Sequence, residues 1–357
     1  MAASTIALVK ALNTVDLPTL GRPTIPRVRL TGSQSRCAPA TFPTLVVGAA
    51  RYVRRVSARE VGEFRVDLAV RRPFAGTTLL AFLAHRAVRG VEAVDATSYA
   101  RTLSLPGGPG TIRITLTDDD PVSAIIRLTD SDDLDRATSL CRRIVDAEAE
   151  PDVIDKALAA DPALSVDVAA CPGIRLPGTV DGAEIVVRAM FGQQVSVAAA
   201  RTTLSALTAR LGEPLPFVDG TLTHLFPDAA AVAALGADGI AGPRRRAAAI
   251  AGLAAAVTSG ELDLGRERPA ADLKADLLAR PGIGAWTADY VAMRLLADRD
   301  VLLTGDLVLR QAAAARGIPA APKALAEYGR RWQPFRSHAG LHLWRAAPTV
   351  TRTATHR

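Results

Sequence analysis

The hydrophobic pattern of the chain changes its period near Pro151, and this change restricts the fold more than any other feature. Before it, apolar and polar residues alternate over short runs, which is typical of half-buried strands. After it, apolar residues recur every three or four positions, which is typical of amphipathic helices. Strands followed by helices predict an α+β domain followed by an all-α domain.

The α+β domain is predicted to span residues 63–148. Alternating runs cover 64–70, 98–105, 111–117 and 122–128, and helical runs cover 76–88 and 134–145. Turn-forming clusters at 106–110 and 118–121 separate the last three alternating runs. The order β-α-β-β-β-α predicts a small antiparallel sheet with two helices.

The second domain, residues 149–345, is predicted to be all-helical. Its expected helices cover 153–160, 181–190, 195–211, 229–235, 244–259, 271–279, 287–297, 306–315, 323–332 and 336–345. Pro, Gly or Asp separates most of them. Residues 346–357 are expected to form a C-terminal tail.

Residues 1–62 differ in composition from the rest of the chain. They mix Pro, Ser, Thr, Gly and Arg without a sustained period and contain nine Lys or Arg against two Asp or Glu. This pattern predicts a mostly disordered basic leader, and a misassigned start codon is the alternative.

The net charge of +7 does not by itself indicate a nucleic-acid partner, because the leader accounts for it. Residues 151–242 hold five basic and ten acidic residues, whereas 243–357 hold eighteen basic and ten acidic residues. Any surface that binds phosphates is therefore expected on the C-terminal part.

The three cysteines, Cys37, Cys141 and Cys171, are too far apart in the sequence to form a typical metal site. Their sparse use is typical of a reducing cytoplasm and excludes a four-cysteine iron–sulfur cluster. The sequence contains no run of about 20 apolar residues, so no membrane-spanning helix is predicted. We expect neither a cofactor nor a metal, and a protein that is cytoplasmic.

The most informative segment is the run Pro281-Gly-Ile-Gly284 between two helical patterns. Two glycines two positions apart allow a tight hairpin with positive φ. Amide groups at such a hairpin point outward at the start of the second helix, where they suit one phosphate oxygen and read no base sequence. If Gly282, Ile283 and Gly284 stood alone, an ordinary helix–helix turn would be the favoured interpretation.

The wider context adds Asp306, which lies 24 residues after Gly282 at the start of a predicted helix. This unit resembles the helix–hairpin–helix DNA glycosylases, in which a catalytic aspartate follows the hairpin at this spacing. The resemblance implies a catalytic role for Asp306. A helix N-cap is the simpler role, and the two roles are compatible.

The resemblance is closer to the alkylpurine branch, typified by bacterial DNA-3-methyladenine glycosylase II, and covers about residues 63–345. The motifs that carry it, besides the hairpin and Asp306, are Phe82-Leu-Ala-His-Arg-Ala-Val88, Gly192-Gln-Gln-Val-Ser-Val-Ala198, Trp286-Thr-Ala-Asp-Tyr290, Arg331-Trp-Gln-Pro-Phe-Arg-Ser337 and Leu341-His-Leu-Trp344. Each motif is moderately specific, and together in this order they are strongly specific.

The resemblance also implies the remaining site residues. Trp286, Tyr290, Trp344 and Phe82 are expected to form an aromatic pocket for an electron-poor or cationic base, although any one of them could be a core residue. DNA contacts are expected from the hairpin with Thr287, and from the loop with Gln193 and Gln194. Gln194 matches the residue that fills the gap left by a flipped base, and a helix-start role is its alternative.

Position 286 separates the branches of the family. Glycosylases that also nick the strand carry there a lysine that forms a Schiff base with the sugar, and this chain has Trp286. The predicted function is therefore monofunctional removal of alkylated purines from duplex DNA by a monomer associated with the nucleoid. A non-catalytic DNA-binding protein and a glycosylase for another damaged base are the alternatives.

A pair of histidines carries less weight than these motifs. His338 and His342 are four residues apart and share a helical face, but no third ligand has suitable spacing, so packing is favoured over a metal. Whether Asp306 opposes positive charge on the sugar or activates water, which lesions are removed, and whether the hairpin holds an ion stay open at this point.

Overall fold

The computed structural model describes residues 46–47, 50–52 and 61–347. The chain divides into two compact units, and the first, Met1–Thr41, lies outside the described residues. Most of the predicted leader and the tail from residue 348 also lie outside them. The described residues belong to the second unit, Phe42–Arg357, which contains two hydrophobic cores.

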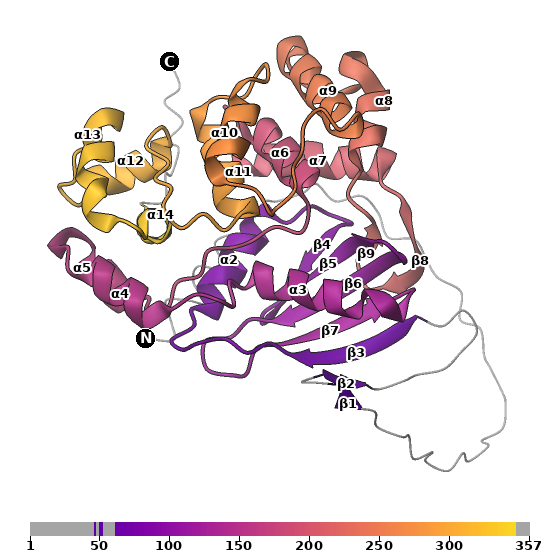
Figure 1. The fold of residues 1–357 in the computed structure, drawn as a ribbon, viewed down its shortest axis with the longest axis horizontal. Coiled ribbons are helices and arrows are strands. Elements are labelled where there is room, and N and C mark those ends of the chain that lie inside the picture. Colours follow the sequence, from indigo (N-terminus) through magenta and orange to yellow (C-terminus); the bar gives the residue numbers. More distant parts are fainter. Residues whose placement is uncertain (1–45, 48–49, 53–60, 348–357) are drawn as a thin grey trace, which may run out of the picture. The chain divides into compact units, whose positions relative to one another are not determined.

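The first core belongs to a seven-stranded antiparallel sheet with the order β1-β2-β3-β7-β6-β5-β4 (Figure 1). The strands are β1 (Val46–Val47), β2 (Ala50–Tyr52), β3 (Gly62–Asp67), β4 (Glu92–Val94), β5 (Ser98–Leu105), β6 (Gly108–Thr115) and β7 (Ser123–Leu128). The helices α2 (Gly76–Arg86) and α3 (Leu134–Ile144) add leucines to the same core. A short 3₁₀ helix, Ser131–Asp133, precedes α3.

The sheet is larger than the predicted one, for two reasons. Strand β4 has only three residues, which is too short for a visible alternation. Strands β1 and β2 lie inside the predicted disordered leader, and β2 pairs with β3 through Ala50 and Val66. The sequence analysis did not predict these two strands, and they extend the sheet because the open edge of β3 offers backbone groups that a short segment can pair with.

The helical part consists of α4 (Pro151–Ala159), α5 (Pro162–Ala170), α6 (Gly182–Gly192), α7 (Val197–Leu211), α8 (Ala229–Gly239), α9 (Arg244–Thr258), α10 (Ala270–Leu278), α11 (Ala285–Leu295), α12 (Leu307–Ala314), α13 (Pro322–Tyr328), a 3₁₀ turn (Gly329–Trp332) and α14 (Arg336–Arg345). Helix α6 is apolar on most sides and is almost wholly buried, so it forms the centre of the second core. Trp332 also lies in this core, and its indole Nε1 donates a hydrogen bond to Asp161 at 2.8 Å.

Helix α5 and the strands β8 (Pro214–Asp219) and β9 (Leu222–His224) of this part were not predicted. Helix α5 begins with Asp161 as N-cap and Pro162 at the first position, which is a recognisable start signal. The strands β8 and β9 form a hairpin, so the part is not purely helical. The two turn residues are Gly220 and Thr221, with φ of 57° at the glycine, which is typical of a two-residue hairpin turn; the prolines of β8 obscured this hairpin.

Helix α2 connects the two parts of the structure. Near its end, Arg188 of α6 donates to the carbonyl oxygen of Arg86 at 2.7 Å, and Arg201 of α7 donates to that of Ala87 at 3.0 Å. These bonds fix α2, which carries Phe82, against the helical part. No helix in the described part of the chain is long and apolar enough to cross a membrane.

Candidate active site

Asp306 occupies the N-cap of α12, and its Oδ1 accepts a hydrogen bond from the amide of Leu309 at 2.9 Å. The residue is half-buried. The capping role that the sequence suggested is therefore present, and it fixes the orientation of the carboxylate. A side chain held in this way can serve as a preorganised negative charge.

Two indoles from different helices point their N–H groups at this carboxylate. Nε1 of Trp286, in α11, donates to Oδ2 of Asp306 at 3.1 Å. Nε1 of Trp344, in α14, donates to Oδ1 at 3.1 Å. The three segments that carry these residues are thus brought together around one anionic group.

The two other predicted pocket residues adjoin these indoles. Tyr290 stacks on Trp286 with ring centroids 5.2 Å apart and planes 4° apart. Phe82, from α2, lies 6.5 Å from Trp344 with the rings tilted by 33°. The structure therefore gathers all five residues predicted for the pocket and its carboxylate, and it draws them from both parts of the chain.

Two arginines complete this cluster, and the sequence analysis did not identify either. The guanidinium carbon of Arg86 lies 3.7 Å from the ring centroid of Phe82. Arg294 donates to the hydroxyl oxygen of Tyr290 at 2.6 Å. Each arginine follows its aromatic partner by four residues on one helix, so the i, i+4 spacing was the available signal.

These cations change the chemistry of the tyrosine. Burial alone would raise the pKa of Tyr290, but the guanidinium groups of Arg294, Arg86 and Arg188 hold that pKa below its usual value. The phenol oxygen accepts a bond from Arg294, so the phenol is positioned rather than free to rotate.

In the hairpin between α10 and α11 the two glycines are exposed, whereas the two other predicted DNA contacts are buried. Gly282 has φ of 79°, and a Cβ there would lie 2.7 Å from that of Ala249, so glycine is required. Gly284 is exposed and faces open space, so a ligand could approach its backbone. Ile283 and Thr287 are buried, with 7% and 2% of their surface exposed.

Gln193 joins the loop after α6 to this hairpin. Its side-chain amide donates to the carbonyl oxygen of Gly282 at 3.0 Å and to the hydroxyl of Thr287 at 2.9 Å. Arg246 donates to the backbone oxygen of Gln193 at 3.2 Å. The next residue, Gln194, is exposed and adopts φ of 59°, a conformation that non-glycine residues rarely occupy.

The two histidines lie apart from this cluster. His338 and His342 are fully buried, and Nε2 of His338 lies 3.5 Å from Oδ2 of Asp146. Burial lowers the pKa of His342 to about 4, with Arg345 and His338 contributing. Within the described ranges, no group of three metal-binding side chains could hold a metal ion.

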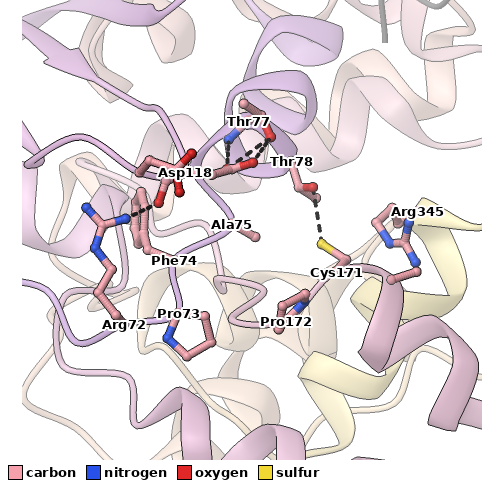
Figure 2. A pocket seen from close by; sticks show the side chains of 12 residues that line it. Arg72, Pro73, Phe74, Ala75, Thr77, Thr78, Asp118, Cys171, Pro172 and Arg345 are labelled. Carbon is pink, nitrogen blue, oxygen red and sulfur yellow. Dashed lines mark hydrogen bonds between the residues drawn. The ribbon is translucent and has the colours of Figure 1, made fainter. Parts of the chain in front are cut away.

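A cavity of about 590 Å³ lies at the beginning of α2, and Figure 2 shows its lining. Asp118 accepts hydrogen bonds there from the amide and hydroxyl of Thr77. The Thr78 hydroxyl lies 3.3 Å from the Cys171 sulfur. None of the five predicted pocket and carboxylate residues lines this cavity.

Comparisons with known proteins identify a family and several similar proteins. Residues 65–181 match the AlkA N-terminal domain family. DNA-3-methyladenine glycosylase 2 of Escherichia coli K12 is 33% identical over 279 residues, which cover 76% of this chain and 94% of that protein. A probable bifunctional transcriptional activator/DNA repair enzyme AlkA of Mycobacterium tuberculosis (strain CDC 1551 / Oshkosh) is 42% identical over 283 residues, or 79% of this chain.

The chain matches only 57% of the length of this mycobacterial relative. Among solved structures, a 3-methyladenine DNA-glycosylase from Archaeoglobus fulgidus superimposes with a TM-score of 0.68 over 78% of this chain and 96% of that one. Its sequence identity of 18% means that this likeness concerns the fold alone.

Proposed function

Because the chain belongs to the family of DNA-3-methyladenine glycosylase 2, we propose that it is a base-excision repair glycosylase. It hydrolyses the N-glycosidic bond of alkylated purines, such as 3-methyladenine and 7-methylguanine, in duplex DNA. The observation that carries the proposal is the Asp306 carboxylate, held by two indole N–H groups beside an aromatic cluster.

The aromatic cluster receives the base after it has been flipped out of the duplex. Alkylated purines are electron-poor or cationic, and aromatic faces attract such rings. Since Trp286 and Tyr290 already stack on each other, the base does not insert between them. The base instead stacks on an aromatic face that remains free among the four rings of the cluster.

Asp306 stabilises the positive charge that develops on the deoxyribose as the bond to the base breaks. Its Oδ1 already accepts two hydrogen bonds, from Leu309 and Trp344, while Oδ2 accepts one, from Trp286. A carboxylate oxygen can accept about two bonds. Oδ2 therefore keeps one position with which to orient the attacking water.

The reaction ends at an abasic site without a strand break. The position at which strand-nicking relatives carry a lysine holds Trp286, whose indole N–H is committed to Asp306. The side chain offers no amine that could form a Schiff base with the sugar. The products are free base and an intact strand.

The exposed backbone of Gly282 and Gly284 binds a DNA phosphate at the start of α11. Because Ile283 and Thr287 are buried, they support this hairpin from inside rather than touching DNA with their side chains. Gln194, exposed at the tip of the neighbouring loop, fills the gap left by the flipped base. Its left-handed backbone conformation is the kind of local strain that often marks a functional position.

Gln193 acts in this scheme as a link between the two DNA-binding loops. We expect Gln193→Ala to reduce base release from duplex DNA about fivefold to tenfold, because the loop that carries Gln194 loses two bonds to the hairpin. Release from a lesion placed in an unpaired bulge should change less than twofold, because little base-pairing energy opposes flipping there. Single-turnover rates on the two DNAs measure this, and equal losses on both would contradict the linking role.

The proposed function is tested by incubating the purified protein with methylated duplex DNA and separating the released bases by chromatography. We expect free 3-methyladenine and 7-methylguanine, and strands that break only after alkali treatment. Binding of damaged DNA with no base release would instead support the alternative, a non-catalytic DNA-binding protein. Release of a different damaged base alone would assign another substrate.

The same proposal implies a monomer that acts on the nucleoid in the cytoplasm and needs no cofactor or metal. An assay in the presence of a chelator, with the protein at concentrations spanning two orders of magnitude, tests both statements. The rate per molecule should be unchanged in each case.

A further inference from the structure

The aromatic cluster has a positive end as well as a negative one. Arg86 and Arg294 both lie against Phe82, with guanidinium carbons 3.7 and 5.1 Å from its ring centroid. Arg294 also contacts the ring of Tyr290, at 5.5 Å. The Asp306 carboxylate stands beyond the other two aromatic residues of the cluster.

Two lines of contacts join these ends. One runs from Asp306 through the indole of Trp344 to Phe82 and the guanidinium of Arg86. Each step in it is a direct hydrogen bond or a ring contact.

The other line runs from Asp306 through the indole of Trp286 to the stacked Tyr290, and from its hydroxyl to Arg294. Both lines begin at a carboxylate and end at a guanidinium. The aromatic rings that are proposed to hold the base therefore separate fixed charges of opposite sign.

The positive end is not neutralised by a carboxylate. In the described part of the chain, neither Arg86 nor Arg294 lies within ion-pair distance of an acidic side chain, whereas the neighbouring Arg188 is paired with Glu92 and Glu184. Burial lowers the pKa of Arg86, as expected for a desolvated cation. An arginine nevertheless keeps its proton in proteins, so the charge stays in place.

Arg294 is also held rigidly. It is 7% exposed, and besides the Tyr290 hydroxyl it donates to the backbone oxygens of Pro177 and Gly178, the latter at 3.1 Å. These carbonyls belong to the segment that leads into α6. A fixed, dry cation of this kind exerts its field without reorganising during a reaction.

We propose that Arg86 and Arg294 are positioning residues that act through Phe82 and Tyr290 to place a positive potential at the base side of the pocket, opposite Asp306 at the sugar side. This inference rests on the proposed glycosylase function. As a consequence, charged groups on both sides of the breaking bond, the arginines at the base and Asp306 at the sugar, accelerate the departure of the base.

The charge movement in the reaction fits this arrangement. When the bond between the sugar carbon and the base nitrogen breaks, its electron pair leaves with the base, and the sugar carbon becomes positive. Water then adds to that carbon and gives its proton to the solvent. A cationic alkylated base becomes neutral in this step, so positive charge moves away from the arginines and toward Asp306.

A field of this kind affects binding and chemistry in opposite directions. The arginines repel a cationic base in the ground state and favour the transition state, in which the base has lost part of its charge. Removing one guanidinium should therefore lower the maximal rate without weakening the binding of the damaged DNA. A purely structural arginine would not produce this separation, because loss of pocket geometry weakens binding and catalysis together.

The test compares Arg294→Met and Arg294→Lys on a duplex with a single 7-methylguanine, under single-turnover conditions at several protein concentrations. We expect Arg294→Met to lower the maximal rate about tenfold, with an unchanged or lower half-saturating concentration. Arg294→Lys, which keeps the charge and loses the planar set of donors, should stay within about threefold of the wild type.

Arg175→Met is the matched control. Arg175 is buried, lies 5.0 Å from the ring centroid of Phe74 and donates to backbone oxygens, but it stands apart from the pocket. If this variant folds, its maximal rate should stay within twofold. If Arg294→Met does not fold, Arg86→Met takes its place, because Arg86 makes a single backbone bond, to Phe82.

Two results would overturn the inference. One is an equal loss of rate in the Lys and Met variants, and the other is a half-saturating concentration that rises in step with the lost rate. Failure of the wild-type protein to release any base would instead overturn the proposed function itself, which keeps the two failures distinct.

Discussion

Asp306→Asn should reduce base release on the order of a thousandfold while binding of the duplex stays within about threefold of the wild type. The variant keeps the size of the side chain and an oxygen that can cap α12 at Leu309. It removes the negative charge that opposes the developing cation. Because this charge acts mainly in the transition state, the loss should fall on the rate and not on binding.

The cap and the charge can be separated by a matched variant. Asp228 caps α8 in the same way, with its carboxylate accepting from the amide of Ala231 at 2.7 Å, but it lies outside the aromatic cluster. Asp228→Asn should release base at the wild-type rate. Single-turnover release and electrophoretic DNA binding, measured side by side, check both variants, and more than a tenth of wild-type activity in Asp306→Asn would contradict the assigned role.

Local signals in the sequence predicted the fold where the pattern was long. The strands β5, β6 and β7 and each helix from α6 to α14 were expected, because apolar residues recur there with the period of the element. Helix α8 continues beyond the expected end at residue 235, past a break in its backbone at Gly236. Strands β4 and β8 were missed although each pairs with the next strand along the chain. Strand β4 has only three residues, and prolines interrupt the pattern of β8, so neither shows a readable alternation.

The candidate site divides in the same way. The resemblance identified the five pocket and carboxylate residues because they lie in recognisable motifs, and the structure brings all five together. Arg86 lies within the Phe82–Val88 motif and Arg294 lies four residues after Tyr290, but both were overlooked. The i, i+4 spacing indicates that each arginine adjoins its aromatic partner, and not that Phe82 of α2 also packs beside Arg294 of α11. The hydroxyl of Thr287 likewise accepts a hydrogen bond from Gln193, which is ninety-four residues away in sequence and could not be paired with it from local patterns.

The junction between the sheet and the helices is held by a buried group of four charges. Glu184 of α6 accepts from Arg101 of β5 at 2.6 Å and from Arg188 at 2.7 Å. Glu92 of β4 lies 3.0 Å from Arg188 and accepts from the hydroxyl of Tyr99 at 2.6 Å. Glu184, Arg101 and Glu92 are each at least 93% buried, so these charges have little access to water.

Glu184→Gln should therefore reduce the free energy of unfolding by roughly 3–5 kcal/mol, the usual effect of leaving a buried charge without its partner. Two arginines would then share the single carboxylate of Glu92. Glu327→Gln is the matched control, because Glu327 forms an exposed pair with Arg330 at 3.1 Å, and it should change stability by less than about 0.5 kcal/mol. Urea unfolding at pH 7 measures both, and a loss below about 1 kcal/mol in Glu184→Gln would contradict the expectation.

The dependence of stability on pH provides a second readout of the same group. Burial would raise the pKa of Glu184, but Arg101 and Arg188 hold that pKa below its ordinary value of 4.5. A carboxyl with a lowered pKa in the folded state binds fewer protons there than in the unfolded state, so the stability it contributes is complete above pH 4.5 and is lost as the pH falls through its folded pKa. The wild-type protein should lose more stability over this acidic range than Glu184→Gln does. If the two proteins lost stability in parallel, Glu184 would not be the carboxylate that these arginines stabilise.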